Sequence, residues 1–481
     1  MHSPIASKLA PTGTSYNPSM NSPLLRSTEL RDLENRHAAA RPPLMERAGF
    51  AAAEFARQLL QGSRAPVLVL AGPGNNGGDA RVMARVLRQR GIKALVVAPG
   101  DAVPPGQYGL VVDGLFGIGL ARPLAGAWAD LVARINAFAG PVLALDIPSG
   151  LDGDTGRVLG VAVRATHTLS FIGGRPGLYT LDGPDHCGEI SIADLGLELG
   201  DFPGALLSSD DFRACLTPRS RNSHKGSYGS LAVAGGAAGM SGAALLAGRA
   251  GLQLGAGRVF VGLLHSLAID PAQPELMLRS PDNALAHATA AVIGPGMGAS
   301  AAALDFLRRA VSADCPSLFD ADALNLLAAH PVLAAGLARR TQPTLLTPHP
   351  AEAGRLLGSS TAAVQADRVA AALQLAQRFQ AHVALKGCGT VVAHPDGRWR
   401  INTSGNPGLA SGGSGDVLSG FIGALLAQGW AADAALAAAV HLHGAAAEAL
   451  TAAGDGPIGI AAGDLIPAAR RLLNRWIAGL A

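Results

Sequence analysis

The chain has 481 residues, a net charge of +3, and 49% hydrophobic against 15% charged residues. This length predicts two or three domains rather than one, and the apolar content excludes a globally disordered chain. No block of Lys and Arg marks a nucleic-acid or anionic-membrane surface. We therefore expect small-molecule partners, with no nucleic acid and no membrane.

Three features bear on the compartment. The chain has four cysteines, Cys187, Cys215, Cys315 and Cys388. They form no CxxC pair, which favours buried thiols in a reducing compartment. Residues 1–22 are rich in Ser, Pro and Asn and lack a continuous apolar segment, so we expect a flexible tail rather than a secretion signal. The longest uncharged stretch, 417–432, is shorter than the ~20 residues of a membrane span and predicts a buried helix. These features predict a cytoplasmic protein.

The first half of the chain alternates between strand and helix patterns. Four short apolar runs bounded by Gly and Pro are predicted strands: Pro66–Ala71, Ala94–Ala98, Leu110–Val112 and Pro141–Asp146. Helical periodicity covers Asp79–Arg90 and Trp128–Phe138 between them. This alternation predicts a parallel sheet covered on both faces, with its site at the carboxyl ends of the strands.

The alternation stops between Asp194 and about Thr217, where Gly, Pro and Ser replace any sustained period. We predict a domain at 23–205, a linker at 206–222 and a second domain at 223–481. Six further strands are predicted: Ser230–Gly235, Arg258–Gly262, Ala290–Gly294, Ser317–Asp320, Thr344–Thr347 and His382–Lys386. No repeat period unites the halves, which indicates fusion of two different α/β domains.

Polar clusters follow three strands of the first half. The Gly-rich turn Gly72–Asp79 opens a helix, where glycines let the backbone approach a ligand and free N–H groups attract phosphate. Asp113–Gly119 and Asp146–Asp152 end two later strands. A single aspartate at such a position is usually a helix cap. Three clusters at the same sheet edge favour a ligand site.

The strongest signal is the loop Asn402–Asp416, followed directly by the apolar helix Val417–Ala427. Small residues with exposed N–H groups at a helix start can form an anion hole for a transferring phosphoryl group. Asp416, the last residue of the predicted loop, is placed to accept a proton from an attacking hydroxyl. The alternative, an ordinary glycine loop with Asp416 as N-cap, fits a loop of this length and polarity less well.

Other segments of the second half fit the same reaction. Lys386–Thr390 ends a strand and offers N–H groups and a hydroxyl to a nucleotide phosphate. His349 either donates or accepts a hydrogen bond with the substrate, or has only a structural role before a helix. Asp320–Asn325 either organises a metal or acceptor site or is a capped helix start. His441 and His443, in an Ala-rich helix, receive no role.

The three N-terminal clusters, with Thr166–Leu178, resemble the epimerase domain of nicotinamide-nucleotide hydrate repair enzymes, which has a Rossmann-like three-layer fold. The resemblance implies that Asp146 binds substrate and acts as the acid/base group. It implies a substrate site formed by Asn75, Asn76, Gly77, Gly78, Asp79, Gly117, Ile118, Gly119, Leu120, Ala121, Arg122, Pro123 and Asp146. It also implies a potassium ion held by Asn76, Asp113 and Ser149. The chain departs from the family at Ala80, where glycine is usual, and at Arg175, where lysine is usual.

From His224 to its end the chain resembles the ADP-dependent NAD(P)H-hydrate dehydratases, whose fold is a ribokinase-like three-layer sandwich. The His-Lys-Gly opening, Gly294–Gly298, Thr347–Glu352 and Gly412–Asp416 carry the likeness. The resemblance implies that the hydrated nucleotide contacts Ala243, Gly296, His349 and Asp416. It implies an AMP/ADP site of Lys386, Gly387, Cys388, Gly389, Thr390 and Gly415. Asp416 would be the catalytic base, ADP the phosphoryl donor and magnesium the divalent cation.

The combined resemblance predicts a bifunctional enzyme. One domain would epimerise the R and S hydrates of NADH and NADPH (NADHX and NADPHX). The other would dehydrate the S form with ADP, giving AMP and phosphate. We also expect a homo-oligomer. The alternative is a ribokinase-like, ATP-dependent small-molecule kinase with a non-catalytic N-terminal binding domain, because the fold and the Gly-Gly-Ser-Gly-Asp loop would be shared.

Overall fold

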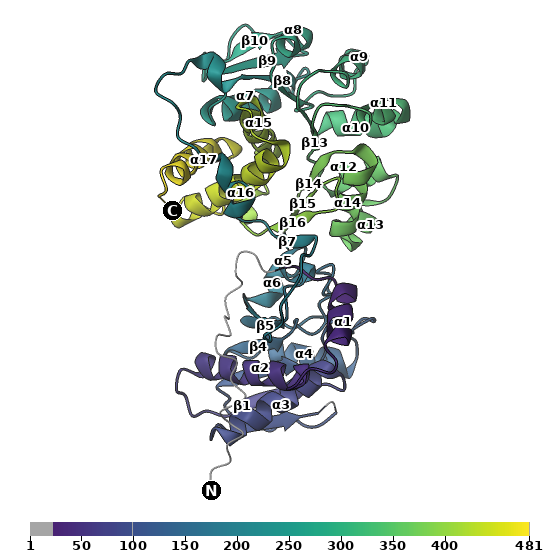
Figure 1. The fold of residues 1–481 in the computed structure, drawn as a ribbon, viewed down its shortest axis with the longest axis vertical. Helices are drawn as coiled ribbons and strands as arrows, with labels where there is room; N and C mark the ends of the chain where they lie inside the picture. The colour runs from purple at the N-terminus through teal and green to yellow at the C-terminus, as the bar shows by residue number, and fades with distance from the viewer. Residues whose placement is uncertain (1–22, 99, 481) are drawn as a thin grey trace. The chain divides into compact units, whose positions relative to one another are not determined.

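The computed structural model describes residues 23–98 and 100–480. The predicted flexible tail at 1–22 lies outside these described residues. By internal contacts the chain divides into two compact units, Met1–Leu206 and Leu207–Ala481. Figure 1 shows that each unit is built from helices packed on a sheet.

The first unit contains a six-stranded sheet of order β2-β1-β3-β4-β5-β6, in which every neighbouring pair is parallel. Its strands are β1 (Val67–Ala71), β2 (Ala94–Val97), β3 (Leu110–Gly114), β4 (Val142–Leu145), β5 (His167–Phe171) and β6 (Glu189–Ala193). Its helices are α1 (Ser27–Arg36), α2 (Leu44–Leu60), α3 (Asn75–Gln89), α4 (Ala127–Asn136), α5 (Pro176–Tyr179) and α6 (Pro184–Cys187), and the short β7 (Gly204–Leu206) follows. The four predicted strands and the parallel sheet are confirmed.

The apolar runs become strands because both faces of the sheet are covered. All five residues of β1 are buried. Helices α2 and α3 form one apolar layer, and α4 forms the other. The strand order reverses between β1 and β3, and ligands bind α/β sheets at such a crevice. The fold therefore places Gly72–Asp79 and Asp113–Gly119 on the two sides of a natural binding position.

Helix α3 begins at Asn75, four residues before the predicted start at Asp79. The sequence Asn-Asn-Gly-Gly has low helix propensity, and for this reason the periodicity pattern missed the first turn. The turn is helical because it packs against the preceding backbone. A Cβ atom at Gly77 would lie 1.9 Å from the carbonyl oxygen of Gly72, so only glycine fits there.

The strands of the second unit follow the order β10-β9-β8-β11-β12-β13-β14-β15-β16. They are β8 (Ser230–Gly235), β9 (Arg258–Leu263), β10 (Met277–Arg279), β11 (Ala290–Ile293), β12 (Ser317–Phe319), β13 (Thr344–Leu346), β14 (His382–Leu385), β15 (Thr390–Ala393) and β16 (Trp399–Asn402). The sheet is parallel from β10 to β14, and β15 and β16 are antiparallel. The six predicted strands are confirmed, whereas β10, β15 and β16 were not predicted.

Helices cover both faces of this sheet (Figure 1). One group consists of α7 (Ser241–Gln253), α15 (Ser414–Ala427), α16 (Ala432–Ala452) and α17 (Ala462–Ile477). The other consists of α8 (Pro281–Ala286), α9 (Ala301–Ala310), α10 (Asp322–Ala329), α11 (Pro331–Leu337), α12 (Pro350–Leu357), α13 (Thr361–Ala366) and α14 (Arg368–Phe379).

Helix α15 confirms the predicted buried helix, because every residue from Val417 to Ala427 is buried. It begins earlier than expected, however, so Asp416 is its third residue rather than the last residue of a loop. Gly413, with φ of +88°, makes the sharp turn into the helix. Within residues 23–98 and 100–480, none of the helices combines the length and apolarity that crossing a bilayer requires.

The burial of α15 gives a stability prediction. Phe421→Ala removes a fully buried ring and is expected to destabilise the second unit by about 3–5 kcal/mol. Val332→Ala, at a side chain that is 85% exposed, is expected to change stability by less than about 0.5 kcal/mol. Urea unfolding followed by circular dichroism measures both, and equal effects would contradict the packing described.

Candidate active sites

A cavity of about 600 Å³ lies in the first unit, at the carboxyl ends of β1, β3 and β4 and beside α1. Eight of the predicted substrate residues line it: Asn75, Asn76, Asp79, Gly117, Ile118, Gly119, Leu120 and Asp146. The structure thus brings the three sequence clusters together around one space.

Five predicted substrate residues do not line this cavity: Gly77, Gly78, Ala121, Arg122 and Pro123. For two of them the packing gives another reason for glycine. Gly77 lies against the backbone of Gly72, and a Cβ at Gly78 would lie 2.6 Å from the methyl carbon of Met45 on α2. These glycines therefore allow α3 to pack closely against its neighbours.

Asp146 follows β4 in a left-handed conformation with φ of +64°, which costs free energy for a residue other than glycine. Its Oδ1 atom accepts a hydrogen bond from Arg175 Nη2 at 3.2 Å, and the Arg175 side chain is fully buried. Arg175 also donates to the carbonyl oxygens of Phe171 and Gly173. The sequence showed Arg175 only as a departure from a family pattern. Its contact with Asp146 depends on the pairing of β4 with β5 and could not be deduced from spacing.

Two more carboxyl groups face the same cavity. Burial, followed by the negative charges of Asp146 and Glu34, raises the pKa of Asp79 to about 8. Glu34 comes from α1, which the sequence did not predict, and burial and Asp146 raise its pKa as well. At neutral pH, Asp79 is therefore mainly protonated and can donate a hydrogen bond.

Asn76, Asp113 and Ser149 form a buried polar cluster beside this cavity. The Asp113 carboxylate accepts hydrogen bonds from the Ser149 hydroxyl at 2.6 Å and the Ser149 backbone N–H at 2.8 Å. Burial raises the pKa of Asp113, while these bonds act in the opposite direction. Asn76 is 6% exposed, and its side-chain oxygen and nitrogen have no hydrogen-bond partner among the described residues. An unpartnered amide oxygen and a fully buried carboxylate fit a monovalent cation such as potassium.

Ala80, the other departure from the family pattern, points away from the cavity. It is fully buried, and a Cβ at Gly114 of β3 would lie 2.5 Å from its methyl group. The methyl therefore packs between α3 and the sheet and does not crowd the Gly-rich turn.

In the second unit, Asp416 lies in the first turn of α15, where the backbone N–H groups have no partner within the helix. Burial, with a smaller contribution from the charge of Asp320, raises the pKa of Asp416 to about 6, and Lys386 opposes this increase. A carboxyl group with a pKa near neutrality is suited to accept a proton.

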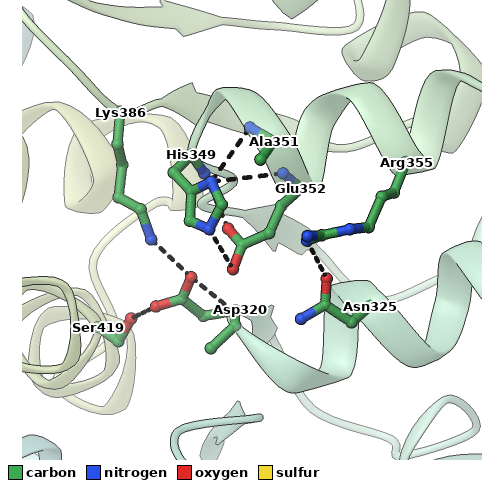
Figure 2. A network of polar contacts seen from close by, with 9 residues as sticks. Asp320, Asn325, His349, Ala351, Glu352, Arg355, Lys386 and Ser419 are labelled. Carbon is green, nitrogen blue, oxygen red and sulfur yellow. Dashed lines mark hydrogen bonds and ion pairs between the residues drawn. The ribbon is translucent and has the colours of Figure 1, made fainter. Parts of the chain in front are cut away.

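Asp320, at the end of β12, is the centre of the network in Figure 2. Its Oδ1 atom accepts from Lys386 Nζ at 2.8 Å, and its Oδ2 atom accepts from the Ser419 hydroxyl at 2.6 Å. It also accepts from the backbone N–H of Ala321 at 2.8 Å. Both carboxylate oxygens are therefore engaged by protein groups, which disfavours the predicted alternative of a metal ligand.

In the predicted nucleotide segment Lys386–Thr390, residues 386–389 form a short loop after β14, and Thr390 is the first residue of β15. The Thr390 hydroxyl donates to the carbonyl oxygen of Gly387 at 3.1 Å. Arg368, 2% exposed, donates through Nη2 to the carbonyl oxygens of Leu385 and Gly389, and so joins the two ends of the loop. The loop meets the start of α15, because Lys386 Nζ is 3.4 Å from the position of a Cβ at Gly415.

His349 is the N-cap of α12, and its Nδ1 atom accepts from the backbone N–H groups of Ala351 and Glu352. Its Nε2 atom lies 3.2 Å from Glu352 Oε1 (Figure 2). Burial and the nearby Lys386 and Arg355 lower the pKa of His349, so the ring is neutral at pH 7. Both ring nitrogens have protein partners, which favours the structural role over the substrate-binding role that the sequence also left open. The His349 side chain is nevertheless 48% exposed.

Ala243 and Gly296 lie together at the second crevice, where the strand order reverses between β8 and β11. A Cβ at Gly296 would lie 3.1 Å from the Ala243 methyl and 2.4 Å from the carbonyl oxygen of Met240. The positive φ of +58° at Gly296 and this close approach both require glycine.

His443, which received no role from the sequence, lies beside the first residue of α15. It is 8% exposed on α16, and its Nε2 atom is 3.2 Å from the Ser414 hydroxyl. Burial lowers its pKa to about 4, so it is neutral. The Ala-rich context gave no signal for this contact, which depends on the packing of α16 against α15.

No group of three or more His, Cys, Asp or Glu side chains that could hold a metal occurs among the described residues. Asp320 is engaged by Lys386 and Ser419, so both oxygens of this carboxylate already have protein partners. The described side chains of the second unit therefore do not fit a protein-held magnesium ion.

Comparisons with known proteins identify the family of the chain. Residues 231–467 match the family described as NAD(P)H-hydrate dehydratase, and residues 42–106 and 99–177 match the YjeF-related protein N-terminus. The chain is 37% identical to the bifunctional NAD(P)H-hydrate repair enzyme Nnr of Coxiella burnetii, over 94% of this chain and 99% of that protein. It is 38% identical to the Escherichia coli protein of the same name, over 90% and 89% of the two chains.

A solved ribokinase-like superfamily protein from Enterococcus faecalis is 25% identical, with a TM-score of 0.50, and the match covers 58% of this chain and 99% of that one. The two units are thus an N-terminal domain of the YjeF-related class and a ribokinase-like domain. The chain belongs to the family of bifunctional NAD(P)H-hydrate repair enzymes. The predicted family and fold class are confirmed.

The raised pKa of Asp79 gives a prediction on stability. Because its folded-state pKa is about 8, the protonated side chain stabilises the fold at low pH. This contribution is lost as the pH rises from about 4, the ordinary value, to about 8. Asp79→Asn is therefore expected to make the first unit more stable than wild type at pH 8–9 and to remove this pH dependence.

Urea unfolding at pH 5, 7 and 9 measures this effect. Asp130→Asn, on the exposed part of α4, is the control and is expected to leave the pH dependence of wild type in place. A decrease in stability of Asp79→Asn at pH 9 would contradict the burial of a protonated Asp79.

Proposed function

We propose that the second unit dehydrates S-NADHX and S-NADPHX with ADP, and that the first unit interconverts their R and S epimers. The observation that carries the proposal is Asp416 in the first turn of α15, with a pKa near 6 and Lys386 beside it. The relatives' printed names, which state NAD(P)H-hydrate repair, support the substrate class.

Direct loss of the ring hydroxyl is slow because hydroxide is a poor leaving group. Asp416 accepts the proton of the ring hydroxyl, and the hydroxyl oxygen bonds to the terminal phosphorus of ADP as the bond to the AMP oxygen breaks. The free N–H groups at the start of α15 stabilise the charge on the transferring phosphoryl group. The phosphate ester then loses phosphate, a far better leaving group, and a ring proton, which restores the dihydronicotinamide.

The arrangement of loops supports distinct positions for the two substrates. The Lys386–Thr390 loop, with Gly415 beside it, is placed to bind the AMP portion of ADP. Ala243 and Gly296 line the crevice between β8 and β11 and are placed to contact the hydrated nucleotide. The proposed reaction requires Asp416 to reach the hydroxyl of the hydrated nucleotide while ADP is bound.

For the first unit we propose that Asp146 moves a proton at the carbon that carries the hydroxyl. Epimerisation requires a group that accepts a proton and a group that donates one. The buried guanidinium of Arg175 lies 3.2 Å from Asp146 and holds this carboxylate in place at the cavity. Asp79, protonated at neutral pH and facing the same cavity, is the complementary donor.

A potassium ion is proposed at Asn76, Asp113 and Ser149. The unpartnered side chain of Asn76 and the buried carboxylate of Asp113 fit such an ion. Its charge would offset that of Asp113 and fix the Asp113–Gly119 loop, without a part in proton transfer.

Asp416→Asn keeps the size of the side chain but removes the base, so ADP-dependent recovery of dihydronicotinamide absorbance is expected to fall by about 100-fold or more. The assay supplies S-NADHX and ADP to the full chain. Epimerase activity of the same variant is expected to be unchanged, and urea unfolding followed by circular dichroism is the control for folding of the second unit. Consumption of ADP or ATP by wild type without recovery of absorbance would indicate the kinase alternative and contradict the assignment.

Asp146→Asn is expected to abolish R-to-S conversion above the spontaneous rate while S-hydrate dehydration continues. Asparagine is preferred to alanine because it tolerates the left-handed backbone at this position. Chromatographic separation of the epimers over time provides the measurement. Conversion at the wild-type rate would exclude Asp146 as the proton-transfer group.

A further inference from the structure

Lys386 has, in the scheme above, only the role of binding nucleotide, yet its ammonium group lies at the start of α15. The Nζ atom is 3.4 Å from the position of a Cβ at Gly415, the residue before Asp416. The side chain is 20% exposed and ends in the ion pair with Asp320. The charge is therefore placed beside Asp416 and directed there by a protein partner.

Asp320 holds the Lys386 ammonium group in this position and connects three segments of the second unit. Its carboxylate, 1% exposed, accepts from Lys386 at the end of β14 and from Ser419 in the second turn of α15 (Figure 2). It also accepts from the backbone N–H of Ala321. Ala321 has φ of +51°, a strained conformation for alanine. Such strain is expected to persist only where surrounding contacts determine the backbone strongly.

We propose that the ion pair of Lys386 with Asp320, held at the start of α15, controls the ionisation of Asp416: Lys386 favours the ionised, proton-accepting carboxylate, and Asp320 opposes it. Asp320 is the positioning residue, and Lys386 acts on the reaction through Asp416. This inference rests on the proposed dehydratase function.

The two members of the pair act on Asp416 in opposite directions. The positive charge of Lys386 lowers the pKa of Asp416, and the negative charge of Asp320 raises it, both against the larger effect of burial. Burial alone would lower the pKa of Lys386, but Asp320, Glu352 and Asp416 outweigh it and raise that pKa. Lys386 is therefore charged throughout the range in which Asp416 titrates.

Other charged or titratable groups near this pair come from three places: Asp322 at the start of α10, His349, Glu352 and Arg355 on α12, and His443 on α16. His443 and His349 have lowered pKa values and remain neutral at pH 7. Asp322 acts on Asp416 in the same direction as Asp320 and less strongly. Lys386 is the cation that favours ionised Asp416.

The test is the acid limb of the pH profile of kcat/KM for S-NADHX, measured with the full chain at saturating ADP. Lys386→Met is expected to move this limb upward by about one pH unit, because an opposite charge is lost. Asp320→Asn is expected to move it downward, because a like charge is lost. Lys386→Arg keeps the charge and is expected to keep the limb near that of wild type.

A matched control removes a buried carboxylate elsewhere in the same unit. Asp270 is also 1% exposed and is paired with Arg249 at 2.6 Å. Asp270→Asn is expected to lower stability and leave the acid limb in place. Epimerase activity of each variant reports whether the rest of the chain is folded.

Limbs that coincide for Lys386→Met and wild type, or shifts of both variants in one direction, overturn the inference. If Asp320→Asn does not fold, the acid limbs of Lys386→Met and Lys386→Arg are compared instead, and equal limbs overturn the inference. A wild-type protein that restores no absorbance with ADP contradicts the proposed function itself. That outcome differs from an active wild type whose variants keep the wild-type acid limb, which would overturn only the inference on the charge pair.

Discussion

The carboxylate of Asp320 is the point on which the geometry of the second unit depends. It leaves the end of β12 and accepts hydrogen bonds from Lys386 after β14 and from Ser419 within α15. A buried carboxylate without partners would be strongly destabilising, so these bonds constrain three elements at once. As a result the Lys386–Thr390 loop and the first turn of α15 face the same space.

The first unit meets a similar constraint with different residues. Asp113, fully buried, is bonded to Ser149, and Asp146 is bonded to the buried Arg175. Both aspartates end parallel strands, where the sheet brings successive loops together. In both units a residue other than glycine takes a left-handed conformation at this edge, Asp146 in one and Ala321 in the other. The fold thus accepts local strain where polar side chains converge.

Much of the fold could be predicted from the sequence because buried parallel strands are continuous apolar runs. Helix starts were less predictable, since Asn75–Gly78 and Ser414–Gly415 are weak helix formers that become helical through tertiary packing. The short edge strand β10 and the β15–β16 hairpin carry weaker patterns and were missed. The predicted homo-oligomeric state and cytoplasmic location stay predictions.

The polar loops of both sites could be predicted, but their partners could not. Glu34, Arg175 and His443 reach the sites through helix or strand packing across long separations in sequence. The engagement of Asp320 by Lys386 and Ser419 has the same origin. Spacing rules describe neighbours along the chain, whereas these contacts depend on which elements become neighbours in space.

In the proposed dehydration, the oxygen of the substrate hydroxyl leaves as part of phosphate. Hydrate prepared in ¹⁸O-labelled water, so that the ring hydroxyl carries the isotope, tests this claim most directly when it reacts with the protein and unlabelled ADP. We expect one ¹⁸O atom in each inorganic phosphate released, detected by mass spectrometry, together with one AMP for each dihydronicotinamide restored. Label recovered in water, with unlabelled phosphate, would contradict it.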